Sequence, residues 1–151
     1  MCSDNIIVRT NIFGWNVKPG RVSSAEWIYG SLKKKKEITL FTNYTFSPIY
    51  TTFLGDIIMQ LVDLNFTGII NVGSSTPCSK YDFGILLAEE FALNSSLIRK
   101  GFIADHSFLA PRSHKLDLNV DKLSGLGRVP PDYRFSIRQF IRNRKESVDY
   151  Y

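Results

Sequence analysis

Apolar residues recur along the chain in two patterns, and these predict short strands alternating with amphipathic helices. Compact apolar runs rich in β-branched residues predict strands at 5–10, 38–41, 68–73 and 97–103. Apolar residues three and four positions apart predict helices between them, at about 24–35, 52–65, 79–93 and from Ser136 onward. This alternation is typical of an α/β fold.

Polar residues at the predicted helix starts support these boundaries. Ser23 stands three residues before Glu26, which is the spacing of a capping box, where each side chain bonds an unpaired backbone N–H. The same spacing separates Ser79 from Asp82. One of the threonines at 51–52 is predicted to cap the helix that follows them.

The predicted loops are where a ligand is expected. Residues 74–77 form a polar turn at the carboxyl end of the strand at 68–73, the end at which α/β proteins usually bind ligands. Residues 43–52 are predicted as a second loop, polar and aromatic. The strand at 5–10 is apolar enough to need neighbours on both sides. Because nothing upstream supplies them, the chain is expected to be the later part of something longer.

Composition limits the number of domains, the membrane segments and the disulfide bonds that can be expected. The 151 residues are 44% hydrophobic and 22% charged, which predicts one globular domain. No apolar run approaches the ~20 residues of a membrane span, and the first ten residues lack a secretory pattern, so a cytoplasmic location is predicted. Cys2 and Cys78 are too few for a disulfide framework and have no metal-ligand spacing.

The net charge of +5 allows attraction to anions, from nucleic acid to a nucleotide diphosphate. Much of it lies in two basic runs, at 33–36 and 138–145, of a kind that usually forms solvated helix faces. A nucleic-acid-binding domain is therefore kept as an alternative. The aromatic residues are not interleaved with the basic runs, which counts against it.

Four segments, in order and with matching spacing, resemble motifs of one enzyme family. Residues 9–14 (RTNIFG) are similar to the R-[PT]-x-x-[VI]-[YF]-G segment of extended short-chain dehydrogenases/reductases. Residues 47–56 (SPIYTTFLGD) resemble the S-P-T-Y-x-x-D-L-A region of dTDP-4-dehydrorhamnose reductases. Residues 68–93 resemble their G-x-Y-H-x-x-G…S-x-Y-D-F-A…A-E segment, and residues 110–123 their R-P-x-x-S-x-L-D-x-x-K-L tail.

This resemblance implies an α/β fold that is the C-terminal, substrate-binding part of an NAD(P)-binding, Rossmann-like extended short-chain dehydrogenase/reductase, without the N-terminal Rossmann half. In a single domain, residues 1–14 would be the last Rossmann-type strand with its exit loop, and 15–151 the substrate lobe. The sequence has no G-x-x-G-x-x-G turn, and the family's catalytic Tyr-x-x-x-Lys helix would precede Met1. Tyr29 and Lys33 have that spacing but follow the R-T segment, so they are predicted to be structural.

The implied function is to hold the sugar nucleotide of an NAD(P)-dependent reductase that acts on a keto-sugar nucleotide, as in dTDP-rhamnose biosynthesis. The full-length enzyme would use NADPH or NADH, whereas this chain alone is expected to bind neither tightly and to be inactive. Its expected partners are the nucleotide sugar and the Rossmann half, or a second copy joined through the first strand. The alternative left open is a non-catalytic binding module of the same family, such as the regulatory subunit of methionine adenosyltransferase.

The resemblance also implies site residues. They are Asn11, Ile12, Trp27, Pro48 and Arg112 for the substrate, and Thr10 with Asn11 for the cofactor. Arg112 carries the strongest expectation, because a guanidinium can grip a diphosphate through two parallel hydrogen bonds.

Other polar and aromatic residues are weighed from their chemistry alone. Tyr44, Phe46 and Tyr50 are candidates for stacking on a base or sugar, with a core role as the alternative. His106 and His114 are predicted to be ordinary loop residues. No residue is assigned a catalytic or metal-binding role, and three carboxylates are predicted to be caps or surface charges, namely Asp82, Glu89 and Glu90.

Overall fold

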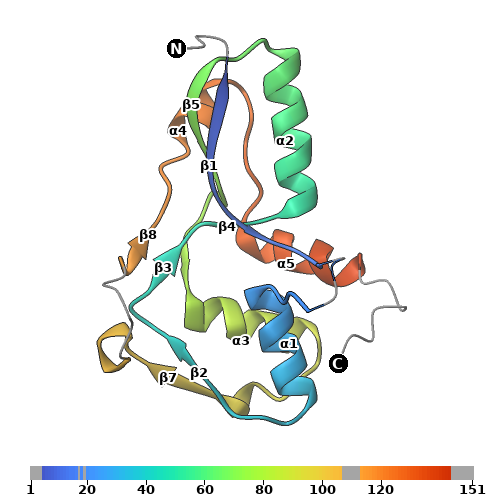
Figure 1. Cartoon of the computed structure of the whole chain (residues 1–151), viewed down its shortest axis with the longest axis vertical. Helices are drawn as coiled ribbons and strands as arrows, with labels where there is room; N and C mark the ends of the chain where they lie inside the picture. The colour runs from blue at the N-terminus through green and yellow to red at the C-terminus, as the bar shows by residue number, and fades with distance from the viewer. Residues whose placement is uncertain (1–4, 17, 19, 107–112, 144–151) are drawn as a thin grey trace.

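The computed structural model describes residues 5–16, 18, 20–106 and 113–143, folded as three small sheets and five α-helices (Figure 1). The strands are β1 (Ile6–Phe13), β2 (Ile38–Phe41), β3 (Thr45–Phe46), β4 (Pro48–Tyr50), β5 (Gly68–Val72), β6 (Cys78–Ser79), β7 (Ile98–Gly101) and β8 (Lys115–Leu116). The α-helices are α1 (Ser24–Lys33), α2 (Thr51–Asp63), α3 (Lys80–Glu90), α4 (Asp121–Gly125) and α5 (Tyr133–Arg142). Two 3-10 helices are η1 (Ser95–Leu97) and η2 (Ile103–Asp105).

The sheets divide the molecule into two regions. The upper region in Figure 1 holds the sheet of order β4–β1–β5 with α2 and α4 beside it. The lower region holds the parallel pair β2–β7 with α1 and α3. The sheet β6–β3–β8 lies between them, and α5 packs on β4 and α3. Apart from β3 with β6, all strand pairs are parallel, as expected for α/β connections.

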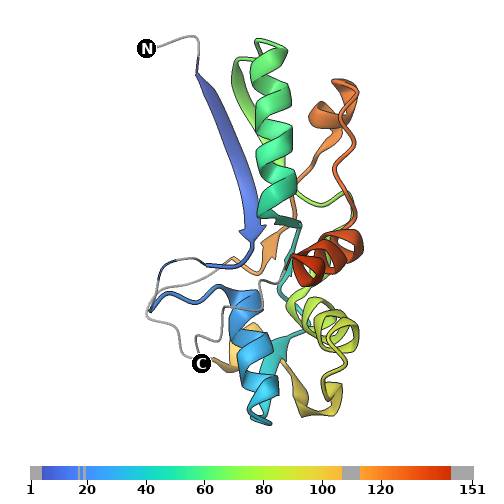
Figure 2. The ribbon, with the colours of Figure 1, turned by 90° about the vertical axis from the view of Figure 1, so that its right-hand side faces the viewer.

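Strand β1 pairs with one strand along its first part and with another along its last part. Its first part pairs with β5, from Ile6 opposite Gly68 to Thr10 opposite Val72. Its last three residues pair instead with β4, on the other side. The predicted strand at 5–10 is therefore confirmed but runs on to Phe13, because β4 supplies a partner there. Along Ile6–Thr10 the side away from β5 carries no strand of the described chain (Figure 2).

The segment 43–52 was predicted as a loop, and this was wrong. It contains β3 and β4, which pair with strands far away in sequence. The predicted threonine cap was also wrong, since Tyr50 is the N-cap of α2 and makes no side-chain cap bond. The last helix begins at Tyr133, earlier than predicted, because the Asp132 carboxylate accepts a hydrogen bond from Arg134 N at 2.6 Å.

The other helix starts follow the predicted capping. Ser23 Oγ accepts from Glu26 N, and Glu26 Oε2 accepts from Ser23 N at 2.7 Å, which completes the capping box of α1. At α3, Asp82 N donates to Ser79 Oγ at 2.9 Å. Each cap satisfies backbone N–H groups that the first turn leaves unpaired. No helix of the described residues is long and apolar enough to cross a bilayer.

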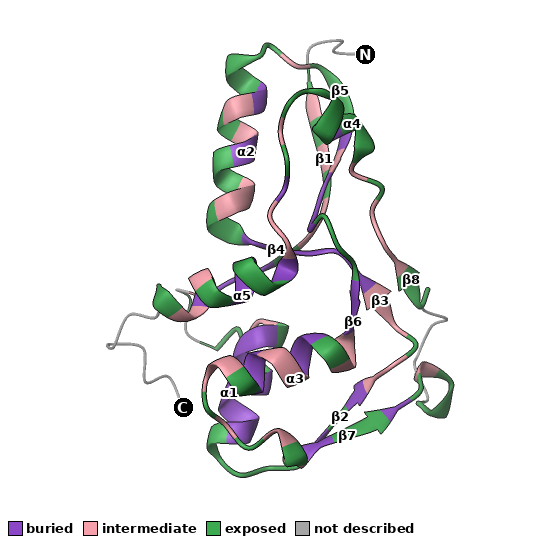
Figure 3. Cartoon of the chain, turned by 180° about the vertical axis from the view of Figure 1, so that it is seen from behind, coloured by how far each residue is buried: buried purple, intermediate pink, exposed green. Residues whose placement is uncertain are grey.

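Two hydrophobic clusters form the core, as the buried segments in Figure 3 indicate. The lower cluster is rich in aromatic rings around Phe140, which stacks on Trp15 with centroids 4.2 Å apart. The upper cluster is aliphatic and smaller; its buried members are Ile49, Ile57, Leu61, Ile70, Val72 and Leu123. On α5, Ile137 and Phe140 are fully buried in the lower cluster, whereas Phe135 is 47% exposed.

Candidate functional site

A hollow of about 450 Å³ lies in the lower region, between α1, the edge of β2 and the start of α3. Its lining residues are Ser24, Trp27, Ile28, Thr39, Leu40, Phe41, Tyr44, Lys80, Ile103 and His106. We call this set the aromatic pocket. Four of its members carry aromatic rings, one carries an ammonium group, and none carries a carboxylate.

Helix α1 forms one wall of the aromatic pocket. The capping box fixes where the helix begins, and hence which residues face inward. Ile28 and Tyr29 are buried in the core, whereas Trp27 is 45% exposed and lines the pocket. An indole in this position offers a flat apolar face to a ligand ring.

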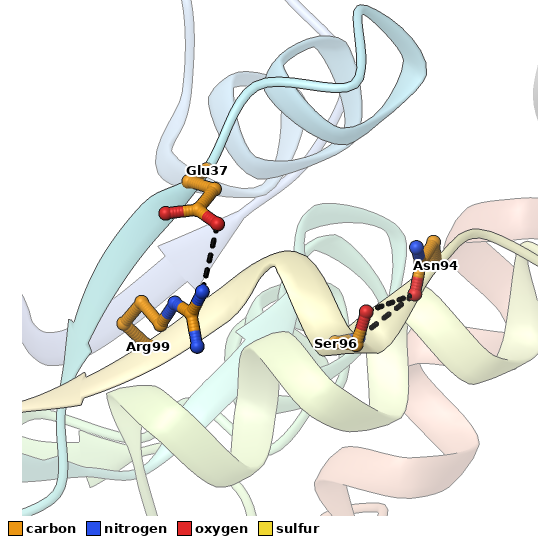
Figure 4. A network of polar contacts seen from close by, with 4 residues as sticks. All are labelled: Glu37, Asn94, Ser96 and Arg99. Atoms are coloured by element: carbon orange, nitrogen blue, oxygen red, sulfur yellow. Dashed lines mark hydrogen bonds and ion pairs between the residues drawn. The ribbon is translucent and has the colours of Figure 1, made fainter.

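Strand β2 and the residues Ile103 and His106 at η2 form the opposite wall. Phe41 lines the pocket, and its ring meets the His106 ring edge-on with centroids 4.9 Å apart. Ile103 N donates to Asn43 Oδ1 at 2.9 Å, which ties η2 to the segment after β2. Farther along, the ion pair of Arg99 with Glu37 and the Asn94 cap of Ser96 hold the outer end of the β2–β7 pair (Figure 4).

Lys80 and Tyr44 close the pocket from the side of α3. Lys80 N donates to Tyr44 O at 3.0 Å, which places the two side chains next to each other. Lys80 Nζ lies 3.7 Å from the centroid of the Phe46 ring and 5.6 Å from that of Tyr44. Burial lowers the pKa of Lys80 to about 8, and the neighbouring Cys78 opposes this only in part.

This arrangement can hold a ligand that has both a planar ring and an anionic group such as a phosphate. The ring faces of Trp27 and Tyr44 suit a nucleobase, since base–aromatic stacking contributes about 1–3 kcal/mol. The Lys80 ammonium suits a phosphate or carboxylate. Among the described residues, no group of three or more potential metal ligands is found.

The predicted residues at the end of β1 lie at a junction between the two regions. Asn11 Oδ1 accepts a hydrogen bond from Ser47 N at 3.1 Å, and Ser47 Oγ accepts one from Leu118 N at 3.0 Å. Thr10 Oγ1 is buried and has no hydrogen-bond partner in the described part of the chain. Ile12 is 56% exposed beside this junction.

The structure brings together only some of the predicted site residues. Trp27 lines the aromatic pocket, whereas Asn11 lies at the junction and Pro48 is fully buried in β4. Arg112 lies outside the described residues. Their predicted roles in binding stay predictions.

Of the aromatic residues that were candidates for stacking, only some line the pocket. Tyr44 lines the pocket, but Phe46 and Tyr50 are buried in the lower cluster. Tyr29, of the Y-x-x-x-K pattern, is also buried and packs on Phe91 with centroids 4.6 Å apart. Its side chain is part of the core, as predicted.

Among the pocket residues that the sequence did not mark as binding candidates, two are ionisable, Lys80 and His106. Lys80 lies between Ser79 and Asp82, whose spacing predicts a helix start and gives no sign of a ligand contact. His106 was taken as an ordinary loop residue, but it lies on the pocket wall. The only local signal for Lys80 is a lysine in the first turn of an otherwise apolar-faced helix, where a cation opposes the helix dipole.

The chain resembles known proteins over part of their length. No family model matches the chain. The spore coat polysaccharide biosynthesis protein SpsK of Bacillus subtilis is 24% identical over 146 residues, covering 97% of this chain and 50% of its own length. The "Probable low-salt glycan biosynthesis reductase Agl14" of Haloferax volcanii is 25% identical over 104 residues, covering 69% of this chain and 35% of its own length.

Solved structures agree with these relatives. The dTDP-4-dehydrorhamnose reductase of Bacillus anthracis, solved with NADP, superposes with a TM-score of 0.83 at 18% identity, over 92% of this chain and 48% of that one. The chain therefore has the fold of about half of this reductase. A dTDP-4-dehydrorhamnose reductase ortholog from Clostridium acetobutylicum superposes with a TM-score of 0.81 at 16% identity, again over 48% of its length.

The α/β fold and the resemblance to part of a dTDP-4-dehydrorhamnose reductase are thereby confirmed. The chain spans half or less of the curated relatives it matches. A dTDP-glucose 4,6-dehydratase of Bacillus anthracis also shares the fold, with a TM-score of 0.70 at 11% identity.

Proposed function

We propose that this chain is the sugar-nucleotide-binding part of an NAD(P)-dependent reductase that acts on a keto-sugar nucleotide. The observation that carries the proposal is the aromatic pocket, a hollow of nucleotide size in a fold shared with dTDP-4-dehydrorhamnose reductases. Trp27 and Tyr44 would stack on the base, and the pocket would exclude water from it. Arg112 would grip the diphosphate, as the sequence resemblance implies.

The redox chemistry is assigned to another part of the enzyme. The 151 residues contain no glycine-rich phosphate turn, and the Tyr29–Lys33 pattern has its tyrosine buried in the core. A cofactor-binding half would therefore supply NADPH or NADH and the proton donor. In this division of labour the hydride reaches a carbonyl carbon of the sugar that the present chain holds in place.

The cofactor-binding half is proposed to pack against β1. Backbone groups of Ile6–Thr10 have a free side within the described chain, and such an edge can add a strand. Ile7 is 52% exposed, and Ile69, opposite it on β5, is 45% exposed. Together they offer an apolar strip for a neighbouring sheet or helix to cover.

Calorimetric titration with dTDP tests the binding role. The chain is expected to bind dTDP, and Trp27→Ala is expected to weaken binding about 10-fold or more, because it removes one stacking face. Phe102→Ala is the matched control, since Phe102 is 55% exposed but does not line the pocket. Equal effects of the two substitutions, or no binding by the unmodified chain, would contradict the proposal.

A turnover assay tests the division of labour. The chain, mixed with NADPH and a 4-keto sugar nucleotide, is expected to leave NADPH absorbance unchanged. Measurable oxidation that depends on the sugar nucleotide would place the redox machinery in this chain.

The free side of β1 also favours a second candidate, a non-catalytic binding module that docks on a protein partner through this strand. This candidate predicts self-association or partner binding through Ile7 and Ile69 with no affinity for dTDP. Sedimentation velocity, run beside the dTDP titration, separates the two candidates.

A further inference from the structure

Lys80 is a half-buried cation with no matching anion among the residues that the structure describes. Its side chain lines the aromatic pocket and lies on the ring of Phe46. Within the described part of the chain it makes no ion pair, and no carboxylate lines the pocket. Burying an ammonium group this way is unfavourable unless something compensates for the lost hydration.

The described protein groups that face Lys80 do not supply this compensation. Cys78, on β6, stays a neutral thiol, because burial and the nearby Asp82 carboxylate raise the pKa of Cys78 to about 12. The Asp82 carboxylate is bonded to Ser79 Oγ at 2.7 Å, as part of the helix cap. Across the pocket stand Tyr44 and His106, and neither carries a carboxylate.

The aromatic rings account for only part of the position of Lys80. A cation over a ring face is attracted to it, most strongly when both are removed from water. This attraction does not restore the hydrogen bonds that three N–H donors of an ammonium group make in water. An anionic oxygen entering the pocket would accept them.

We propose that Lys80 anchors the phosphate-bearing end of the ligand in the aromatic pocket and so selects nucleoside diphosphates over uncharged nucleosides. The inference rests on the proposed function and adds to it a specificity residue. The aromatic walls stack on the base, and Lys80 binds the phosphate. Arg112 is assigned a separate grip on the diphosphate and is not needed for this step.

The test compares three probes: dTDP, thymidine and inorganic pyrophosphate. Lys80→Met keeps the aliphatic stem on the Phe46 ring but removes the charge. It is expected to weaken dTDP binding about 10- to 100-fold, the worth of a charge-assisted hydrogen bond, and to leave thymidine binding unchanged. Lys100→Met is the matched control, since Lys100 is exposed on β7, with Nζ 5.3 Å from the Tyr81 ring centroid.

The unmodified chain provides a second test that needs no substitution. Because burial lowers the pKa of Lys80 to about 8, the ammonium loses its proton as the pH rises through this value. Binding of dTDP is therefore expected to weaken between pH 7 and pH 9, a range that stays below the ionisation of the thymine base, while thymidine binding stays level over the same range. In Lys80→Met the pH dependence of dTDP binding in this range should disappear.

Each outcome decides something. If dTDP binds and Lys80→Met binds it equally well, the inference is overturned and the proposed function stands. If pyrophosphate binds through Lys80 but dTDP binds no tighter, the anion site stands and the nucleotide function fails. If no probe binds, both fail. A lower melting temperature of Lys80→Met, with dTDP and thymidine weakened equally, would assign Lys80 a purely structural role.

Discussion

The two regions of the molecule differ in how completely they bury their apolar residues. The lower region surrounds Phe140 with aromatic neighbours, among them Phe13, Trp15 and Phe91, and Phe140 itself is fully buried. The upper region has a small aliphatic cluster, and several of its apolar side chains face outward. Among these are Ile7, Met59, Val62 and Ile69, each at least 45% exposed.

The difference fits a division of tasks. The lower region has a closed core and positions the walls of the aromatic pocket, so it can hold a ligand in a fixed geometry. Among the described residues, the upper region leaves one side of β1 along Ile6–Thr10 without a strand and exposes Ile7 and Ile69, as a surface that packs against a neighbour would. In our account the lower region binds the sugar nucleotide and the upper region meets the cofactor-binding half.

The largest expected effect is on the closed core. Phe140→Ala removes the ring on which Trp15 stacks and should lower the free energy of unfolding by about 3–5 kcal/mol. Met59→Ala, at a side chain 60% exposed on α2, is the comparison and should change it by less than about 0.5 kcal/mol. Urea denaturation followed by circular dichroism measures both. Similar losses for the two variants would remove the contrast between the regions.

The junction between the regions should be next in sensitivity. A Cβ added at Gly73 would lie 2.9 Å from Ser47 O, a backbone atom that cannot move aside as a side chain could. Gly73→Ala should therefore lower the free energy of unfolding by about 1–3 kcal/mol. It should also disturb the Asn11–Ser47 contact, visible as changed amide shifts of both residues. A stability equal to that of the unmodified chain would show that the junction is looser than the contacts indicate.

Local sequence patterns predict some elements of this fold and miss others. The starts of α1 and α3 were predictable, because their capping partners lie three residues apart. Strands β3 and β4 were not, because their partners are distant: Thr45 pairs with Ser79 and with Lys115. A two-residue strand has no periodicity of its own, and Pro48 favours reading its surroundings as a loop.

The candidate site was predictable only in part for the same reason. Trp27 was implied as a site residue by the family resemblance, and it lines the pocket. Lys80 reaches the pocket only because its backbone bonds Tyr44, 36 positions earlier in the chain. Such contacts depend on the pairing of β3 with β6, which no local pattern of charge or hydrophobicity reports.

The smallest expected effect is at the free strand. Ile7→Ala should change the free energy of unfolding by less than about 0.5 kcal/mol, because the side chain is 52% exposed. Ile70→Ala, in the neighbouring strand but 1% exposed, should lower it by about 2–5 kcal/mol. Thermal melts of the two variants make the comparison. A large loss for Ile7→Ala would mean that this face is already covered in the folded chain.

Mapping of backbone amide shifts during a dTDP titration tests the central claim most directly. The account predicts that the largest ¹H–¹⁵N shift changes fall on residues of the aromatic pocket, in particular Trp27, Tyr44 and Lys80, while β1 stays unchanged along Ile6–Thr10. Shift changes that cluster on Ile6–Thr10, or none at saturating dTDP, would contradict it.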